Sequence, residues 1–441
     1  MSVIQYFRQI IVFIFRRMIR LVVRKSLWSF IAAAFIYAII ITIWSSEEDN
    51  TQYLAISLNK SRQYVPESKN PPIVWWNAGY RLIDETIECA EHIKCDAFSM
   101  NYKLRSNTEG AYLFYASRLN FTDLPLPRYP EKIIWALSHE ESPRNVVELL
   151  HETGLNLFNF SSTFSRYSNV PFTLQYMETL GAITNKKHFV ETGEKNKFSD
   201  KIAPVIFMSS NCYTFSDREN YVKELMKYIP VDSYGECLNN KQWPTDFPKD
   251  HLNNLDNAAI LDFVAKYKFA IAIENGVCED YITEKFWRPI NLGVVPIYFG
   301  SPSIKDWFPN NKSAILIQDF ASPKLLSKHL YELMRNDTLY EEYLEHKTKG
   351  LISNERLHSE IEVRPYQTDV LKTSIEFECF VCKNLHEHRR RPKINIVTKS
   401  HYNCSKPTSA LTKEPIQSEM PFWEYAKVNA ERLYERVRSA K

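Results

Sequence analysis

The sequence has few glycines and lacks the motifs by which several enzyme classes hold a cofactor or a metal. Ten glycines occur in 441 residues. None forms G-x-G-x-x-G after a strand or G-x-x-x-x-G-K-[ST], so neither a dinucleotide dehydrogenase nor a P-loop enzyme is supported. Asp-x-Asp, which could bridge a metal to a diphosphate, is absent. The net charge of +3 gives no reason to expect a nucleic-acid partner. The length suits two domains with appendages.

The N-terminal segment contains bases, an uncharged apolar run and acids, in that order. Six bases precede the first acid, Glu47, and residues 27–44 are eighteen residues without a charge. At about 1.5 Å per residue such a helix spans roughly 27 Å, close to the hydrocarbon thickness of a bilayer. The charge order predicts a cytosolic basic tail (1–26), a transmembrane anchor (27–44) and a luminal stem (45–70), a single-pass type II topology. A cleaved signal peptide is the alternative, but no small-x-small cleavage site follows the run.

A luminal body changes how the eight cysteines are interpreted, because disulfides form in oxidising compartments. A zinc site is the alternative, with the candidate ligands Cys379, Cys382, His386 and His388. Their gaps are too tight for an ordinary zinc finger, so we predict no metal site. Six sequons are N-glycosylation candidates: Asn59, Asn120, Asn159, Asn311, Asn336 and Asn403. The expected location is the membrane of the endoplasmic reticulum or Golgi apparatus, with the body of the chain in the lumen.

Strand-like and helix-like segments alternate along the rest of the chain, which predicts parallel α/β sheets. Short β-rich runs such as IVWWNAG and KIIWALS define a first domain, 71–195. After a charged boundary segment, APVIFMSS, FAIAI and VVPIYFG define a second domain, 196–383. The four-residue spacing of Tyr221, Leu225 and Ile229 predicts a helix, and Ser322 before Pro323 predicts another helix start. Residues 384–441 comprise a basic tail and an amphipathic helix at about 422–437.

The stretch ENGVCEDYITEKFWRPINLGVVPIYFGSP (274–302) joins the strand FAIAI to a helix. Open α/β sheets bind ligands at the carboxyl ends of their strands, and helix N-termini favour phosphate. A polar stripe on this helix has the spacing i, i+3, i+4 and i+7 and consists of Tyr281, Glu284, Lys285 and Arg288. Lys285 and Arg288 suit phosphate charge, whereas Glu284 can accept from sugar hydroxyls. A solvated helix face without a ligand is the alternative.

Two further segments supply candidate site residues. Arg218 opens the helix after FMSSN and is a second cation that could meet a diphosphate; an exposed arginine at a helix start is the alternative. In ALSHEESPRN, Glu140 and Glu141 follow a strand, where a carboxylate can deprotonate an acceptor hydroxyl. A glutamate that only stabilises a helix start is the alternative there, and we attribute His139 to local structure.

Together these segments resemble the α-1,3-fucosyltransferase family, glycosyltransferase family 10. AIENGVCEDYITEKFWRPINLGVVPIYFGSP is similar to its donor-site signature, and the other matches are SSNCYTFSDRENYVKELMKYIPVDSYGEC, ALSHEESP and the pair Cys379-x-x-Cys382. The resemblance covers about residues 73–383. It implies a GT-B fold, in which two Rossmann-like domains face a cleft. It also implies an inverting transfer of fucose from GDP-fucose that requires no cofactor; whether a divalent metal stimulates the transfer is left open.

The resemblance implies a role for each matching residue. Glu141 would be the general base. The donor would be bound through its diphosphate by Arg218 and Lys285, through ribose or fucose hydroxyls by Glu284, and elsewhere by Tyr281 and Asn275, with Val231 and Tyr234 near guanine. The sequence departs from the family pattern at IENG, where FENS is usual, and at Asn169, where Asp is usual. The second departure lies in the acceptor half, so it bears on the acceptor.

The function of the chain has three interpretations, two of which differ in the acceptor. The run GSPSIKDWFPNNKSAI resembles a divergent branch whose members fucosylate Ser or Thr of small disulfide-rich protein modules, so we favour protein O-fucosylation. An α-1,3 linkage to GlcNAc of an N-glycan or related glycan is the first alternative. The second is a catalytically silent, GDP-fucose-binding or chaperone-like membrane protein. Such a protein would be expected to have lost one of Glu141, Arg218, Glu284 and Lys285, all of which are present.

The same resemblance implies a pairing of cysteines. Cys89 and Cys95 are expected to pair with Cys379 and Cys382, which would attach the C-terminal segment to the first domain. Cys212 is expected to pair with either Cys237 or Cys278. One cysteine among the rest, Cys404, stays unassigned.

Overall fold

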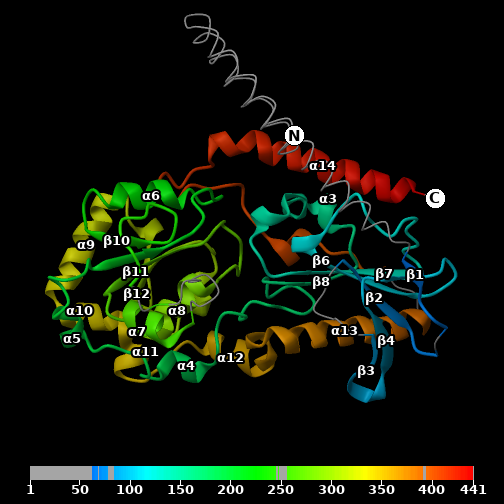
Figure 1. Ribbon diagram of the computed structural model, residues 1–441, viewed down its shortest axis with the longest axis horizontal. Coiled ribbons are helices and arrows are strands. Elements are labelled where there is room, and N and C mark those ends of the chain that lie inside the picture. The colour runs from blue at the N-terminus through cyan, green and yellow to red at the C-terminus, as the bar shows by residue number, and fades with distance from the viewer. Residues whose placement is uncertain are drawn as a thin grey trace, which may run out of the picture. The chain divides into compact units, whose positions relative to one another are not determined.

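The computed structural model describes residues 62–67, 69–77, 84–244, 247, 256–390 and 394–440. The expected tail and anchor, most of the stem and the sequon at Asn59 lie outside these residues. Within the described residues, no helix combines the length and the apolar character needed to cross a membrane. Residues from Tyr64 onward form one compact unit with two main sheets (Figure 1).

The first sheet has six strands in the order β3-β4-β2-β6-β7-β8, and only the β3–β4 pair is antiparallel. The strands are β2 (Pro72–Asn77), β3 (Glu85–Glu88), β4 (Lys94–Phe98), β6 (Gly110–Tyr115), β7 (Ile133–His139) and β8 (Phe160–Thr163). The short strands β1 (Gln63–Tyr64) and β5 (Tyr102–Lys103) lie outside it. Side chains alternate between faces along β2: Ile73 and Trp75 pack with one cluster, and Val74 and Trp76 with another.

The second sheet has five parallel strands in the order β10-β9-β11-β12-β13. The strands are β9 (Val205–Met208), β10 (Val231–Tyr234), β11 (Phe269–Ile273), β12 (Val295–Phe299) and β13 (Ile315–Leu316). One face packs against α6 (Arg218–Leu225) and α9 (Pro323–Arg335), and the other against α7 (Ala258–Val264) and α8 (Glu284–Leu292). The other α-helices described before α13 are α3 (Glu152–Leu155), α4 (Leu180–Thr184), α5 (Thr192–Asn196), α10 (Asp337–Glu341), α11 (Glu345–Thr348) and α12 (Glu355–Val363). The predicted α/β class with parallel sheets is confirmed.

Local sequence signals account for the helices of this second sheet. Tyr221, Leu225 and Ile229, whose spacing predicted a helix, are all buried, but α6 ends at Leu225 and Ile229 lies beyond it. Ser322 caps α9, because its side chain accepts from the backbone N–H of Leu325. Gly293 ends α8 with φ of +66°, and a Cβ there would lie 2.3 Å from the ring of Phe189.

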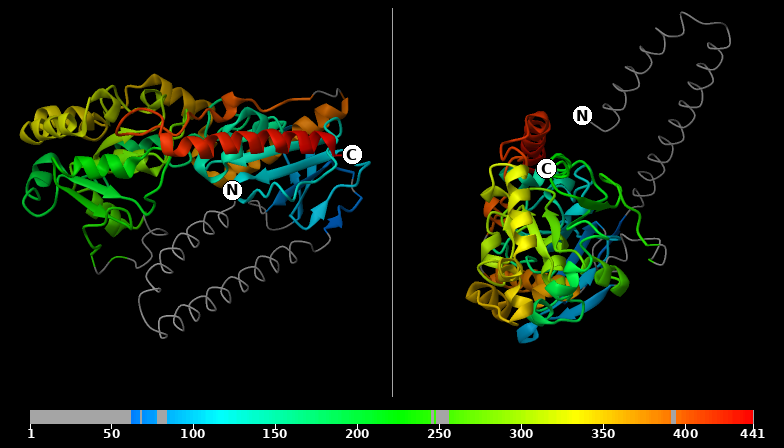
Figure 2. Two further views of the ribbon diagram at one scale, coloured as in Figure 1. Left: turned by 90° about the horizontal axis from the view of Figure 1, so that it is seen from above. Right: turned by 90° about the vertical axis from the view of Figure 1, so that its left-hand side faces the viewer.

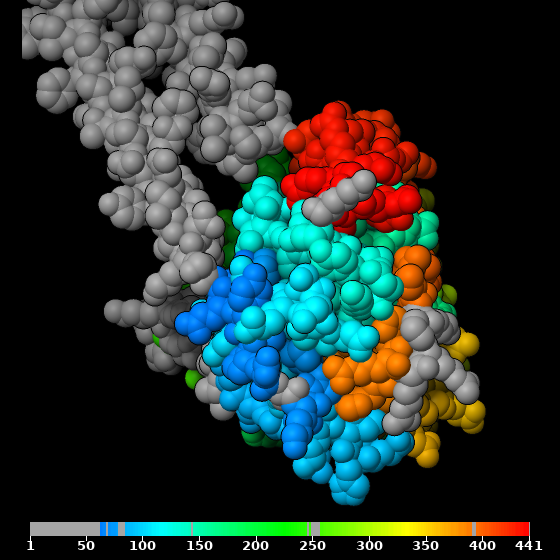
Figure 3. Space-filling view, turned by 90° about the vertical axis from the view of Figure 1, so that its right-hand side faces the viewer, coloured from blue at the N-terminus to red at the C-terminus, as the bar shows by residue number. Residues whose placement is uncertain are grey.

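The C-terminal helices return to the first sheet. Helix α13 (Val370–Arg390) falls mostly inside the second domain expected from the sequence, 196–383, but the structure packs its Phe377, Val381 and Leu385 against the six-stranded sheet. The helix expected at about 422–437 is α14 (Met420–Ser439), whose Trp423 and Leu433 join the cluster on the opposite face. Figures 2 and 3 show α14 (red) and α13 (orange) on this half of the molecule.

The eight cysteines form four disulfides. Cys89–Cys379 and Cys95–Cys382 confirm the expected attachment of the C-terminal segment to the first domain. Cys212 pairs with Cys237, which decides between its two expected partners. The expectation that Cys404 stays unassigned is wrong, because Cys404 pairs with Cys278 across 126 residues.

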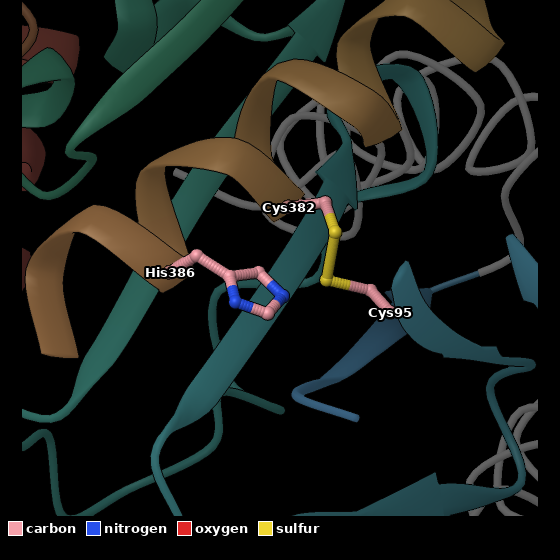
Figure 4. A group of neighbouring side chains, drawn as sticks. All are labelled: Cys95, Cys382 and His386. Carbon is pink, nitrogen blue, oxygen red and sulfur yellow. A yellow bond between two sulfur atoms is a disulfide. The ribbon is translucent and has the colours of Figure 1, made fainter. Parts of the chain in front are cut away.

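Cys95, Cys382 and His386 lie close together (Figure 4). The two sulfur atoms are bonded to each other, so neither is available as a thiolate ligand. The Nε2 atom of His386 lies 2.9 Å from the backbone oxygen of Lys94, which makes it a helix-to-strand contact.

The segment 397–410, here called the strap, contacts loops of both sheets. At its start the N–H of Val397 donates to the backbone oxygen of Phe158, and at its end the N–H of Ala410 donates to that of Ser216. Between them, Tyr402 Oη lies 2.8 Å from His139 Nδ1. Burial lowers the pKa of His139 to about 3, so this imidazole is neutral and structural, as the sequence suggested.

A buried ion pair, here called the clamp, also joins the two sheets. Asp280 is fully buried and accepts from Arg166 at three donors: its backbone N–H (2.9 Å), Nε (2.9 Å) and Nη2 (2.7 Å). Ser303 Oγ and Trp307 Nε1 donate to the same carboxylate, at 2.6 and 3.0 Å. Because Arg166 follows β8 and Asp280 follows β11, the clamp fixes the carboxyl end of one sheet against that of the other.

The five described sequons differ in accessibility. Asn120, Asn311, Asn336 and Asn403 are exposed, but Asn159 is 5% exposed and its Nδ2 donates to the backbone oxygen of Asn395 at 2.9 Å. We therefore expect peptide mass spectrometry after deglycosylation in H₂¹⁸O to find label only at exposed sequons. Label at Asn159 in folded, secreted material would contradict its buried position.

Candidate active site

The turn between β11 and α8 is organised around Glu274. This residue is fully buried, and its carboxylate accepts from the backbone N–H and the hydroxyl of Thr283, both at 2.8 Å. Thr283 is also the N-cap of α8. A Cβ at Gly300 would lie 2.6 Å from Cγ of Glu274, so glycine there leaves space for the carboxylate. We did not select Glu274 from the sequence, although it lies in the quoted stretch.

Lys285 lies between two carboxylates at the start of α8. Its Nζ is 2.9 Å from Glu284 Oε1, 3.0 Å from Thr283 Oγ1 and 3.7 Å from Glu274 Oε2. Burial alone would raise the pKa of Glu284, but the charges of Lys285 and Arg288 outweigh it and hold that pKa at about 2. Glu284 is therefore ionised at physiological pH and can only accept hydrogen bonds, as its assigned contact with sugar hydroxyls requires.

Arg218, the first residue of α6, extends its side chain to the carboxyl end of β11. It is 4% exposed, and its guanidinium donates to Ser209 Oγ (2.7 Å) and to the backbone oxygens of Asn211 (3.0 Å) and Ile273 (3.3 Å). Burial lowers the pKa of Arg218, and the nearby charge of Glu274 opposes this. The Arg218 Nε and Asn275 Oδ1 atoms are buried without a hydrogen-bond partner. Buried polar atoms normally have partners, so these two fit a site for a polar ligand.

Tyr281 and Arg288 flank this cluster. Tyr281 is 3% exposed and packs on Phe164 of the first half, with ring centroids 5.0 Å apart. Arg288 lines a pocket of about 210 Å³ with Glu284 and Tyr176. Tyr176 belongs to an irregular loop and was missed, because no sequence pattern marks it.

The first half contributes the carboxylates after β7. Glu140 is buried, and one of its oxygens accepts from the Tyr115 hydroxyl at 2.7 Å. Burial chiefly raises the pKa of Tyr281 and of Tyr402. Negative charge raises it further, first that of Glu274 for Tyr281 and that of Glu140 for Tyr402, with a smaller effect of Glu141 on both. Glu141 lies two residues after the end of β7, at the carboxyl end of the first sheet, which the clamp joins to the second sheet.

Val231 and Tyr234, which were expected to lie near the guanine of the donor, have side chains packed on other parts of the protein. Val231 is the first residue of β10, paired with Val205 at the amino end of the sheet, and its side chain is in the core. The structure thus does not bring Val231 to the other candidates. Tyr234 lies at the carboxyl end of β10, but its ring packs on Trp243 and its hydroxyl lies 3.1 Å from that of Tyr267. A contact of Tyr234 with a ligand stays a prediction.

Cations and an ionised carboxylate at the carboxyl ends of parallel strands, with a second carboxylate opposite, are typical of transferases that act on a diphosphate-linked donor. The family model "Glycosyltransferase family 10 (fucosyltransferase) C-term" matches residues 198–400. The chain is 42% identical to "GDP-fucose protein O-fucosyltransferase 3" of Gallus gallus over 355 residues, which are 78% of this chain and 73% of that protein. It belongs to glycosyltransferase family 10, the fucosyltransferases.

Other relatives carry two kinds of name. "GDP-fucose protein O-fucosyltransferase 3" of Homo sapiens is 39% identical over 381 residues, covering 83% of this chain and 78% of that protein. "Alpha-(1,3)-fucosyltransferase B" of Drosophila melanogaster is 44% identical over 345 residues, covering 76% of each. A solved structure, "Crystal Structure of alpha1,3-Fucosyltransferase with GDP-fucose", is 17% identical with a TM-score of 0.35 and covers 69% of this chain and 93% of that chain, a likeness too distant to bear on the fold.

Proposed function

We propose that the protein transfers L-fucose from GDP-fucose, with inversion, to a Ser or Thr hydroxyl of a small disulfide-rich protein module. The observation that carries this proposal is that the clamp joins the carboxyl ends of the two sheets, where Glu141 follows β7 on one side and Glu284 and Lys285 begin α8 on the other. That arrangement supports a GT-B type site, with a base on one half and a donor-binding helix on the other. The names of the relatives support GDP-fucose as the donor.

In the proposed reaction Glu141 removes the proton of the acceptor hydroxyl while that oxygen attacks the anomeric carbon of fucose. The bond from this carbon to the diphosphate oxygen breaks with its electron pair, and GDP leaves. Lys285 and Arg218 stabilise the charge that develops on the leaving diphosphate, and Glu284 accepts from donor hydroxyls. We propose no cofactor beyond the donor substrate, because these two cations can meet the leaving-group charge themselves.

The membrane and compartment assignments are part of the proposal. We propose a type II protein anchored by residues 27–44 in the endoplasmic reticulum or Golgi, with the active site in the lumen. Four disulfides support an oxidising compartment.

The acceptor can be tested directly with the purified full chain. GDP-fucose is supplied with folded EGF-like, kringle and Kunitz modules and, separately, with a GlcNAc-terminated N-glycan, and products are mapped by mass spectrometry. We expect O-fucose on Ser or Thr of a folded module. Fucose found only on GlcNAc would reject the protein acceptor in favour of α-1,3-fucosylation, the activity that the name of the Drosophila relative suggests. No transfer to any acceptor, with GDP-fucose still bound, would favour the catalytically silent protein.

A further inference from the structure

The loop between β9 and α6 presents one prominent side chain to solvent, Tyr213, which is 76% exposed. The loop around it is firmly held. Cys212, its neighbour, is in a disulfide with Cys237, and the Tyr213 N–H donates to Asn211 Oδ1 at 2.9 Å. Two residues later, Phe215 is 5% exposed and packs in the core of the first half. A rigid loop therefore displays an aromatic ring that contributes little to the core.

The contacts of this loop place Tyr213 at the margin of the active site. On one side, the backbone oxygen of Asn211 accepts from Arg218 at 3.0 Å, and Arg218 is a candidate for binding the diphosphate. On the other side, the Phe215 ring lies under the guanidinium of Arg144, 5.9 Å from the ring centroid. Arg144 is three residues after Glu141. The loop that carries Tyr213 thus contacts Arg218 through Asn211 and Arg144 through Phe215.

Arg144 adds a charge to this margin. Its guanidinium contacts the Phe215 ring and its backbone N–H donates to Ser142 Oγ, and no carboxylate of the described residues lies within ion-pair distance of it. Single exposed tyrosines are ordinary on a protein surface. Tyrosine and arginine are nevertheless enriched where proteins bind one another, because each offers a large contact area and Arg pairs well with carboxylates.

We propose that Arg144 and Tyr213 form a docking lip for the acceptor, and that the acceptor is a polypeptide with an acidic side chain near the modified hydroxyl. This proposal rests on the proposed function. The charge of Arg144 would pair with that side chain, while Tyr213 would be covered by apolar surface of the same module. A neutral GlcNAc-terminated glycan would gain nothing from the charge of Arg144.

The test uses the purified full chain and the module, among those above, that the wild type fucosylates with the highest kcat/KM. We expect Tyr213→Ala to raise the KM for this module about tenfold, as the loss of an interface anchor does, and Arg144→Gln to raise it about fivefold. The KM for GDP-fucose and the hydrolysis of GDP-fucose without acceptor should stay within about twofold, because neither side chain contacts the donor cluster. Adding NaCl should raise the KM of the wild type for the module but not that of Arg144→Gln.

Tyr64→Ala is the matched control. Tyr64 is 50% exposed and its ring lies beside Lys103 and Arg105. Leu104, between these two residues, packs on the amino end of β6, whereas the candidate site lies at the carboxyl ends of the strands. Loss of the Tyr64 ring should therefore leave all kinetic constants unchanged. Two results would overturn the lip: an unaltered module KM in both variants, or an equal rise in the KM for GDP-fucose. If the wild type fucosylates only the glycan, the proposed function fails before any variant is compared, and the lip fails with it.

Discussion

Replacing Glu141 with Gln is expected to reduce turnover by about a hundredfold or more while leaving GDP-fucose binding intact. The amide keeps the size of the side chain but cannot take a proton from the acceptor hydroxyl. Since Glu141 follows β7 of the first half, whereas Arg218 and Lys285 belong to α6 and α8 of the second half, its loss should not disturb the diphosphate site. Initial rates with saturating acceptor, together with calorimetric titration of GDP-fucose, would separate the two effects.

Two comparison variants sharpen this result. Glu140→Gln is the matched control, because Glu140 already accepts from the Tyr115 hydroxyl and an amide oxygen can still do so; its turnover should fall by less than about tenfold. Lys285→Ala should instead weaken GDP binding itself, because it removes a cation from the start of α8. Full turnover of Glu141→Gln, or a large loss of turnover in Glu140→Gln alone, would show that Glu141 is not the general base.

The second large effect concerns stability. Asp280→Asn is expected to lower the free energy of unfolding by about 3–5 kcal/mol, as breaking a buried ion pair does. Asn tolerates the positive φ of +63° at this position, so the backbone should be kept. Its amide cannot accept from Arg166, Ser303 and Trp307 as the carboxylate does, and a guanidinium whose side chain is only 11% exposed would lose its main partner. Urea unfolding of the oxidised full chain, followed by tryptophan fluorescence, measures the change.

Asp306→Asn is the control for the clamp. Asp306 also pairs with Arg166, at 3.0 Å, but its side chain is 28% exposed and it has a second partner, Arg356. Solvent screens such a pair, so the expected loss is about 1 kcal/mol or less. Equal unfolding midpoints for the two variants would show that Asp280 does not hold the halves together.

Features coded by neighbouring residues were predicted well. The apolar spacing in α6, the serine cap of α9 and the start of α8 within 274–302 all depend on residues within a few positions of each other. The resemblance of longer motifs also predicted the family and the disulfide bonds that attach Cys379 and Cys382 to the first domain. The polar stripe was correct for Glu284, Lys285 and Arg288, which lie on α8, but Tyr281 precedes the N-cap Thr283 and is not part of the helix.

Other features were missed because they depend on contacts between distant segments. Cys278–Cys404 spans 126 residues, and Tyr402 meets His139 across 263. Helix α13 was assigned to the nearer domain by sequence position, but its apolar face matches the six-stranded sheet. Asn159 satisfies the sequon pattern, yet the fold buries it.

By itself the sequence determined the class of elements, the helix that begins the donor site and the family, because periodicity, caps and motifs are local properties of the chain. Only the tertiary structure decided which strand ends meet, which cysteines pair and which polar residues are buried. Those outcomes depend on which surfaces pack together once the strands are ordered, and no stretch of neighbouring residues contains that information.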